Sequence, residues 1–200
     1  MGLGWLMRGE HRQGGGSPQY KHHEIETVTL IAGGEPASGR KWKKIADEVA
    51  ATFLRKNWNL VYCGMGTGLA GNIATKVLKG GGKVTAVVVT NSLPPDLPDG
   101  AKTHKVSDFH NRRRKLFDLG DGALVLPGGS GTLSELTDLV AWKNAGLYKK
   151  PLVVYDPDRW FAPVANFYME ARRRRVSTCM PWAAASGPRR IVFMMQNELI

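Results

Sequence analysis

The stretch LPGGSGTLSEL, Leu126–Leu136, joins an apolar run to the first turns of a helix. Four hydrophobic residues, Ala123–Leu126, lead directly into Pro-Gly-Gly-Ser-Gly-Thr. Glycines let a backbone turn sharply and approach an anion closely, and a helix N-terminus offers free N–H groups and a partial positive charge. The pattern therefore predicts a strand that ends at a phosphate-binding turn. A phosphate alone would repel the carboxylate of Glu135, so that residue needs a function of its own.

The rest of the chain alternates in the same way. Five continuous apolar runs lie at 27–34, 58–64, 83–89, 122–129 and 150–156. Such runs are typical of strands that are covered on both faces of a parallel sheet. RRIVFMM (189–195) is a candidate sixth strand. Amphipathic patterns predict helices over 38–57, 72–82, 106–121, 132–148 and 159–175. The sequence thus predicts an α/β fold, a doubly wound parallel sheet of the Rossmann-like type in a single domain.

Three segments are expected along the chain. Residues 1–24 are predicted to be a flexible or disordered N-terminal segment, 25–171 a Rossmann-like nucleotide-binding domain, and 172–200 a basic C-terminal extension that includes the candidate sixth strand. Ligands of such sheets bind beyond the carboxyl ends of the strands. The loops where a site is expected are 32–35, 63–71, 90–105 and 127–132.

The chain is strongly basic. Its 200 residues carry a formal net charge of +11, and basic runs lie at 112–115, 172–175 and 189–190. This charge fits either a solvated surface around a site for a small anion, or a surface that faces nucleic acid.

Two cysteines, Cys63 and Cys179, make no disulfide framework, and no apolar run reaches the roughly 20 residues of a membrane span. We expect a cytoplasmic protein, or alternatively a mitochondrial or other organellar one, without membrane contact, metal or cofactor.

A second glycine loop, GMGTGLAG at Gly64–Gly71, superficially matches a dinucleotide-binding fingerprint. That fingerprint needs an acid after the following strand, which here ends in Thr90-Asn91. A mononucleotide or a sugar phosphate fits better. Arg112 is a candidate ligand for phosphate or carboxylate because a guanidinium binds both as a fork. His110 is interpreted as a structural histidine.

These motifs carry a family resemblance. PGGSGTLSE (127–135) resembles the PGGxGTxxE signature of the Lonely Guy proteins, the cytokinin riboside 5′-monophosphate phosphoribohydrolases that are often labelled lysine decarboxylases. FHNRR (109–113) stands at the family's Met-His-Glu-Arg-Lys block, with matching spacing to the PGG motif. VYCGMGTGLAG (61–71) and AWKNAGLYKKP (141–151) resemble two further family blocks.

The resemblance implies a homodimer that hydrolyses the N-glycosidic bond of a nucleoside 5′-monophosphate to free base and ribose 5-phosphate. Arg112 and Glu135 fall on the family's catalytic pair. The residues expected to hold the substrate and its phosphate are Gly33, Gly64, Gly68, Arg113, Gly128, Gly129, Ser130, Gly131 and Thr132. Cleavage builds positive charge on the ribose ring, and a carboxylate beside the ring stabilises that charge, which gives Glu135 its function.

Several positions differ from the family pattern. Glu35 ends the first loop, Cys63 and Met65 interrupt the family's triple glycine, and Asn111 replaces a glutamate. Two alternatives therefore stay open: a non-catalytic subunit of an RNA–protein assembly such as an organellar ribosome, and a nucleotide or molybdopterin carrier that binds without hydrolysis.

Overall fold

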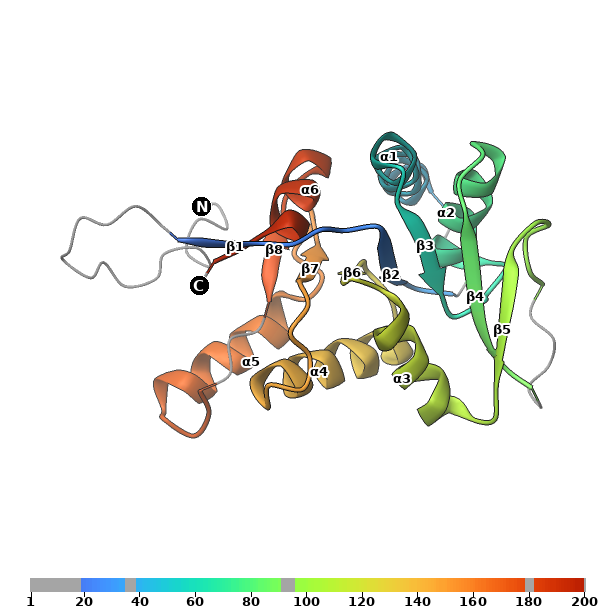
Figure 1. The fold of residues 1–200 in the computed structure, drawn as a ribbon. Helices are drawn as coiled ribbons and strands as arrows, with labels where there is room; N and C mark the ends of the chain where they lie inside the picture. Colours follow the sequence, from blue (N-terminus) through green and yellow to red (C-terminus); the bar gives the residue numbers. More distant parts are fainter. Residues whose placement is uncertain (1–18, 35–38, 91–95, 179–181, 200) are drawn as a thin grey trace.

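The computed structural model describes residues 19–34, 39–90, 96–178 and 182–199. Within them, seven strands form one parallel sheet in the order β5-β4-β3-β2-β6-β7-β8 (Figure 1). The strands are β2 (Thr27–Ile31), β3 (Asn59–Tyr62), β4 (Val84–Val89), β5 (Lys102–Val106), β6 (Gly122–Val125), β7 (Leu152–Tyr155) and β8 (Ala183–Ala185). A separate antiparallel ribbon pairs β1 (Tyr20–His22) with β9 (Asn197–Leu199) and projects from the body of the molecule.

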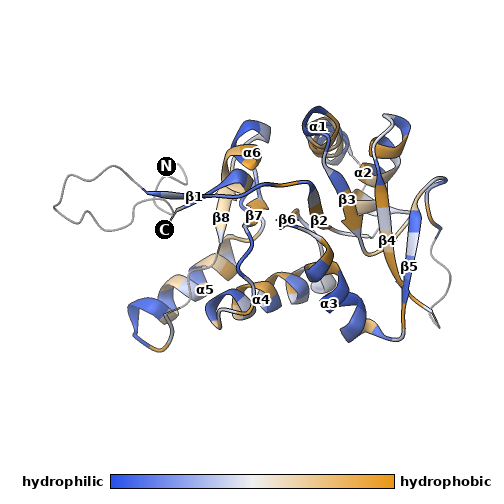
Figure 2. Cartoon of the chain, viewed as in Figure 1, coloured by the Kyte–Doolittle hydropathy of each residue, from blue (hydrophilic) through white to orange (hydrophobic). Residues whose placement is uncertain are grey.

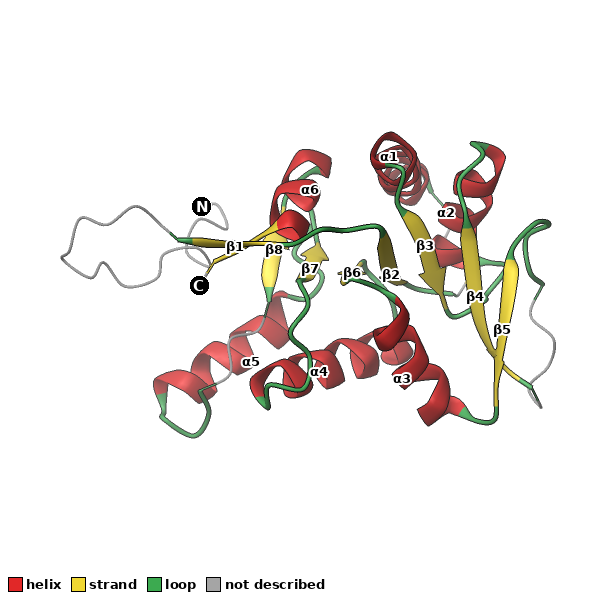
Figure 3. Cartoon of the chain, in the orientation of Figure 1, coloured by secondary structure: helices red, strands yellow, loops and turns green. Residues whose placement is uncertain are grey.

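Helices cover both faces of the sheet (Figures 1 and 3). One face carries α1 (Arg40–Lys56), α2 (Gly68–Lys79) and α6 (Pro188–Gln196), and the other carries α3 (Phe109–Leu119), α4 (Ser130–Asn144) and α5 (Ala162–Arg173). The prediction of a doubly wound parallel sheet is confirmed.

The protein has two hydrophobic cores, one on each face of the sheet, which explains why the sequences of the strands are continuous apolar runs. Successive strand residues point to opposite faces, so Leu124 packs under α1 and α2 while Ala123 and Val125 pack over α3 and α4. All four residues of β6 are buried. Figure 2 shows the hydrophobic residues gathered in the central strands and the inward faces of the helices, with hydrophilic residues on the outer faces.

The strand order reverses between β2 and β6. From β2 the chain proceeds outward through β3, β4 and β5, and from β6 it proceeds the other way through β7 and β8. The chain leaves these two central strands toward opposite faces of the sheet, and the carboxyl ends of such strands are the usual ligand site of this architecture. Here the loops stay in contact, because the N–H of Gly33 donates to the carbonyl of Pro127 at 3.2 Å.

The predicted sixth strand at 189–195 is wrong, since these residues lie within helix α6. Ile191, Met194 and Met195 are buried at the i, i+3, i+4 spacing of a helix face, and Pro188 stands in the first turn, where proline is favoured. A short apolar run fits a strand and a buried helix equally well. The sheet edge is instead occupied by β8, which pairs with β7. Thus the segment 172–200 supplies both an edge strand and a core helix.

Strand β5 lies where a loop and the start of a helix were expected. Its residues Lys102–Val106 form the opposite edge of the sheet and are mostly exposed, so they lack the apolar pattern by which the other strands were predicted. As a result α3 begins at Phe109, after the N-cap Asp108, rather than at Val106. No helix in the described ranges is long and apolar enough to cross a membrane.

Candidate active site

The PGG turn lies at the carboxyl end of β6, where the strand order reverses. β6 ends at Val125, and α4 begins at Ser130 after the N-cap Gly129. The first N–H groups of a helix have no intrahelical acceptor. In α4 the N–H of Leu133 donates to the carbonyl of Gly129 at 3.0 Å, so the N–H groups that lie before Leu133 are the ones without such an acceptor. Ser130, Gly131 and Thr132 thus present their N–H groups at the carboxyl edge of the sheet.

The glycines of this turn serve two different purposes. A β-carbon on Gly128 would collide with the hydroxyl of buried Thr132, so Gly128 is required by the protein's own packing. A β-carbon on Gly129 or Gly131 would meet no described atom within 4 Å, and neither glycine has a positive φ. Neither packing nor backbone conformation therefore explains Gly129 and Gly131, and the open space beside them suits the close approach of a ligand.

Arg112 and Glu135 meet beside this turn. Nη2 of Arg112, from α3, lies 3.5 Å from Oε1 of Glu135, from α4. The Glu135 side chain is 10% exposed and that of Arg112 23%. The guanidinium also lies 4.8 Å from the centre of the Phe109 ring, a cation–π distance. The structure thus brings together the two side chains that the sequence predicts as a catalytic pair.

Burial sets the electrostatics of the pair. It raises the pKa of Glu135 above its usual range, while the charges of Arg112 and Arg113 act in the opposite direction. The buried Nε atoms of Arg112 and Arg113 both lack a hydrogen-bond partner among the described residues, so each guanidinium has an unused donor.

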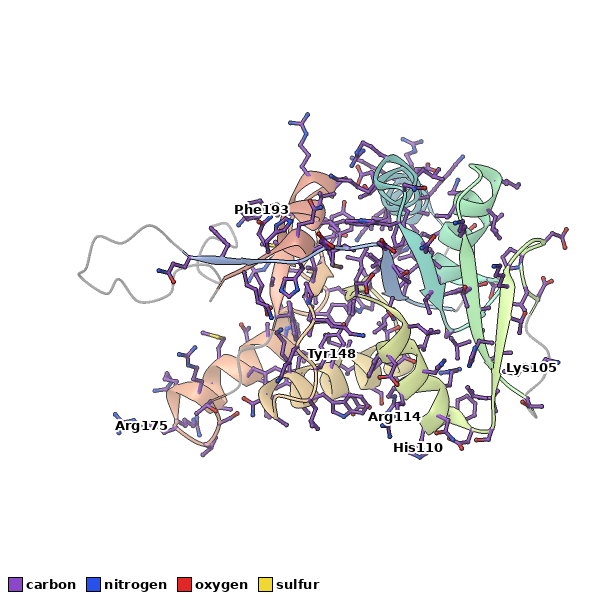
Figure 4. The ribbon with its side chains drawn as sticks, viewed as in Figure 1. Lys105, His110, Arg114, Tyr148, Arg175 and Phe193 are labelled. Atoms are coloured by element: carbon purple, nitrogen blue, oxygen red, sulfur yellow. The ribbon has the colours of Figure 1, made fainter. Side chains whose placement is uncertain are left out.

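Arg113 points to a different set of partners. It forms an ion pair with Asp138 and donates to the hydroxyl of Ser134 at 3.1 Å, both on α4. These contacts tie α3 to α4, and a phosphate at Arg113 would have to compete with Asp138. His110 and Arg114 point away from the sheet at the outer side of α3 (Figure 4).

The loops after β2 and β3 contact each other at the same edge of the sheet. The hydroxyl of Thr67 donates to the carbonyl of Gly34 at 2.8 Å, and the N–H of Ala70 donates to that of Gly33 at 3.2 Å. Gly64 and Gly68 have φ angles of 82° and 67°, a region that favours glycine, so the fold itself requires both. Glu35, which ends the first loop, and Asn91, which follows the third predicted strand, lie outside the described residues.

Cys63 and Met65 both lie in the loop after β3. Met65 is exposed and packs against Gly34. The pKa of the Cys63 thiol is raised by its burial and by the negative charge of Glu135. A raised pKa leaves the thiol protonated and weakly nucleophilic, in keeping with a packing role. No group of three or more His, Cys, Asp or Glu side chains arranged for a metal ion occurs in the described ranges.

One residue of the site was missed from the sequence. Trp160 follows β7, and its indole N–H donates to the carbonyl of Gly128 at 3.0 Å while 53% of the residue stays exposed. The carboxylate of buried Asp156 accepts the N–H groups of Trp160 and Phe161 at 2.6 and 2.8 Å and so fixes this loop. The position of Trp160 in the sequence could have indicated it, because the loop after the fifth predicted strand leaves the sheet at the same edge as the loops after the other four strands.

Comparisons with known proteins identify the family of this chain. The model of a family described as "possible lysine decarboxylase" matches residues 70–179. The cytokinin riboside 5′-monophosphate phosphoribohydrolase of Rhodococcoides fascians is 31% identical over 166 residues, which are 77% of this chain and 84% of that protein. A probable enzyme of the same name from Oryza sativa subsp. japonica is 29% identical over 146 residues; the match spans 72% of this chain but 60% of that protein.

Solved structures share the fold. The molybdenum cofactor binding protein of Rippkaea orientalis superposes with a TM-score of 0.61 at 17% identity, over 84% of this chain and 94% of that one. The molybdenum cofactor carrier protein of Chlamydomonas reinhardtii gives 0.60 at 16% identity over the same shares. Such low identities establish the architecture alone. The family match and the 31% identical relative go further: this chain belongs to the Lonely Guy family, whose family model is described as "possible lysine decarboxylase".

Proposed function

We propose that the protein hydrolyses the N-glycosidic bond of a nucleoside 5′-monophosphate, releasing the free base and ribose 5-phosphate. The observation that carries this proposal is the Arg112–Glu135 pair, 3.5 Å apart, beside an open glycine turn at the N-terminus of α4. A helix N-terminus and a buried carboxylate on the same helix suit a substrate that has a phosphate at one end and develops positive charge at the other.

The 5′-phosphate would bind against the free N–H groups of Ser130, Gly131 and Thr132. The helix dipole of α4 favours an anion there, and the space beside Gly129 and Gly131 admits it. Because the phosphate takes no part in the reaction, its binding energy serves to hold the ribose at Glu135.

Glu135 would act on the ribose ring. As the bond between C1′ and the base breaks, the electron pair leaves with the base and C1′ becomes positively charged. The ionised carboxylate stabilises that charge, or accepts a proton from the water that attacks C1′. The hydroxide of that water ends on C1′, and the proton ends on the departing base. Arg112 favours the ionised form of Glu135 and offers its remaining N–H donors to the substrate.

The substrate class we propose is an adenine-type monophosphate, either AMP or a cytokinin riboside monophosphate. Support comes from the relatives that carry the latter name at 26 to 31% identity. We place the protein in the cytoplasm, with an organelle such as the mitochondrion as the alternative.

We also propose a homodimer. The family resemblance implies this state, and Phe109 on α3, Leu147 just beyond α4 and Phe167 on α5 are exposed apolar side chains that an interface on this face of the sheet would cover. Light scattering should give twice the chain mass of 21.9 kDa, and a monomer would contradict this part of the proposal.

A non-catalytic subunit of an RNA–protein assembly is the second candidate function. The observation in its favour is the concentration on α1, α2 and α6 of cations that have no acidic partner among the described residues. A carrier that binds the nucleotide without turnover is a further outcome that the same assay distinguishes.

The test is release of the free base from AMP and from N6-prenylated AMP, followed by chromatography. We expect turnover by the natural chain and a loss of about 100-fold or more in Glu135→Gln. The matched control, Asp118→Asn, removes an exposed carboxylate on α3 and should keep full activity. The proposal would be contradicted if the natural chain released base from none of the nucleotides tested, or if Glu135→Gln kept full activity.

A further inference from the structure

A cationic groove lies outside the site described above. It has a volume of about 760 Å³ and runs between the end of α1 and the start of α6. Four of its lining residues are cationic: Arg55, Lys56, Arg189 and Arg190. The sheet separates it from Arg112 and Glu135, because α1 and α6 cover one face while α3 and α4 cover the other (Figure 1).

None of these four cations forms an ion pair with an acidic residue in the described part of the chain. All four are exposed, and Arg55 makes one weak contact at 3.4 Å with the hydroxyl of Thr52. Arg55 and Lys56 lie in the last turn of α1, where the helix dipole favours cations. Their positions thus have a structural explanation.

Arg189 and Arg190 have the opposite relation to their helix. They lie in the first turn of α6, which contains no acidic residue and whose N-cap Gly187 offers no side-chain cap. A helix N-terminus is unfavourable for cations, and the two arginines also face the cations at the end of α1. The arrangement costs stability, and a bound polyanion would relieve that cost.

The charge extends beyond the groove. Helices α1, α2 and α6 carry ten Lys and Arg side chains against two acidic ones. Seven of the ten have no acidic partner among the described residues: Arg40, Lys43, Arg55, Lys56, Lys79, Arg189 and Arg190. On α3, α4 and α5, by contrast, at least five of the seven Lys and Arg side chains form ion pairs. The unpaired positive charge of the described helices is therefore concentrated on one face, over an area that a single small anion would not cover.

An aromatic pair borders the same helix. Phe193 lies one turn after Arg189 on α6 and contacts Tyr20 of β1 edge to face, with 5.5 Å between the ring centres. Both residues are more than 40% exposed, and Figure 4 shows Phe193 on the side of α6 next to β1. Cations that follow a backbone, together with aromatic rings on which bases stack, are typical of sites for single-stranded nucleic acid.

We propose that the groove between α1 and α6 binds the phosphodiester backbone of single-stranded nucleic acid, with Arg55, Lys56, Arg189 and Arg190 contacting phosphates and the Tyr20–Phe193 pair receiving a base. This site is separate from the nucleotide site at α4 and does not depend on the reaction proposed there.

The test measures the fluorescence anisotropy of labelled 16-nucleotide oligo(U) and oligo(dT) over a series of salt concentrations. The natural chain should bind, and its affinity should fall steeply with salt. Changing Arg55, Lys56, Arg189 and Arg190 together to Gln should weaken binding at least about 10-fold near 0.1 M salt and lower the slope of log K against log salt by about 3. The matched control changes Arg114, Lys115, Arg173 and Arg174 to Gln on the other face and should keep the natural slope.

A second variant separates binding from folding. In Arg189→Gln/Arg190→Gln we expect weaker oligonucleotide binding together with a melting temperature that is about 1–3 °C higher, because two unfavourable charges leave the start of α6. Phe193→Ala should weaken binding without changing the salt slope.

The proposal is wrong if the natural chain does not bind either oligonucleotide, or if the groove variant and the control lose affinity equally. Equal, groove-dependent binding to duplex DNA or to vesicles of phosphatidylserine and phosphatidylcholine would also overturn it, since that result would identify the surface as a general polyanion or membrane-binding face.

Discussion

Glu135 depends on its surroundings for its protonation state. Burial favours the neutral acid, and the neighbouring guanidinium groups favour the ion. The sequence predicted Glu135 and Arg112 correctly as neighbours, because the PGG motif and the preceding arginine have fixed places in the fold. It did not predict that the two adjacent arginines contact different carboxylates, Arg112 that of Glu135 and Arg113 that of Asp138. Side-chain direction on α3 decides that, and it depends on how α3 packs against α4.

The raised pKa of Glu135 predicts a pH profile. If the carboxylate is the active form, the rate of base release rises with pH as Glu135 loses its proton, and the acid limb lies above the ordinary glutamate value of 4.5. Arg112→Gln removes the largest charge that lowers this pKa, so its residual activity should have an acid limb at higher pH. The profile of kcat against pH checks this, with Arg114→Gln as the control that should keep the natural profile. An acid limb that moves to lower pH in Arg112→Gln would be inconsistent with a carboxylate acting at Glu135.

Trp160 is predicted to position the phosphate-binding turn. Its indole N–H holds the carbonyl of Gly128, which orients the turn that leads into α4. Trp160→Phe removes that hydrogen bond and keeps an aromatic ring, so we expect KM for AMP to rise about 2- to 10-fold, the worth of one hydrogen bond, with kcat little changed. Trp42→Phe is the control, since Trp42 touches Trp160 only edge to face. An unchanged KM in Trp160→Phe, or a loss confined to kcat, would rule out the positioning role.

Among the elements, buried parallel strands and long amphipathic helices were the easiest to predict. β2, β6 and β7 are short apolar runs closed by turns, and α1 and α5, which follow β2 and β7, have clear amphipathic periodicity. β5 and β8 were missed for a common reason: an edge strand of Lys-Thr-His-Lys-Val or of three alanines has little apolar patterning. These segments are strands because β5 pairs with β4 and β8 pairs with β7. Such pairing depends on residues that are distant in the sequence and cannot be predicted from the segment itself.

Helix α6 gives a direct test of the corrected element. In a strand Ile191 and Phe193 would share one face, whereas in the helix Ile191 is fully buried and Phe193 is exposed. Ile191→Ala should therefore lower the free energy of unfolding by about 2–5 kcal/mol. Phe193→Ala should cost no more than about 1.5 kcal/mol, the worth of its contact with Tyr20. Urea unfolding measures both, and equal losses would favour a strand.

Across the protein, the two faces of the sheet differ in charge. The α3–α5 face pairs most of its cations and carries Arg112, the arginine of the proposed catalytic pair, while the α1, α2 and α6 face leaves seven cations without an acidic partner in the described ranges. The sequence predicted the excess charge and its three basic runs, but the groove combines Arg55 with Arg189, which lie far apart in the sequence. Only the packing of α6 beside α1 brings them together.

The central claim is that one site holds a phosphate at α4 and a ribose at Glu135. The most direct measurement is a crystal structure of Glu135→Gln, in which turnover is slow, soaked with AMP. We predict the phosphate within hydrogen-bond distance of the N–H groups of Ser130, Gly131 and Thr132, and C1′ of the ribose facing the substituted side chain at position 135, beside Arg112. A nucleotide bound elsewhere on the protein, or one whose phosphate lies at α4 while its ribose points away from position 135, would contradict the account.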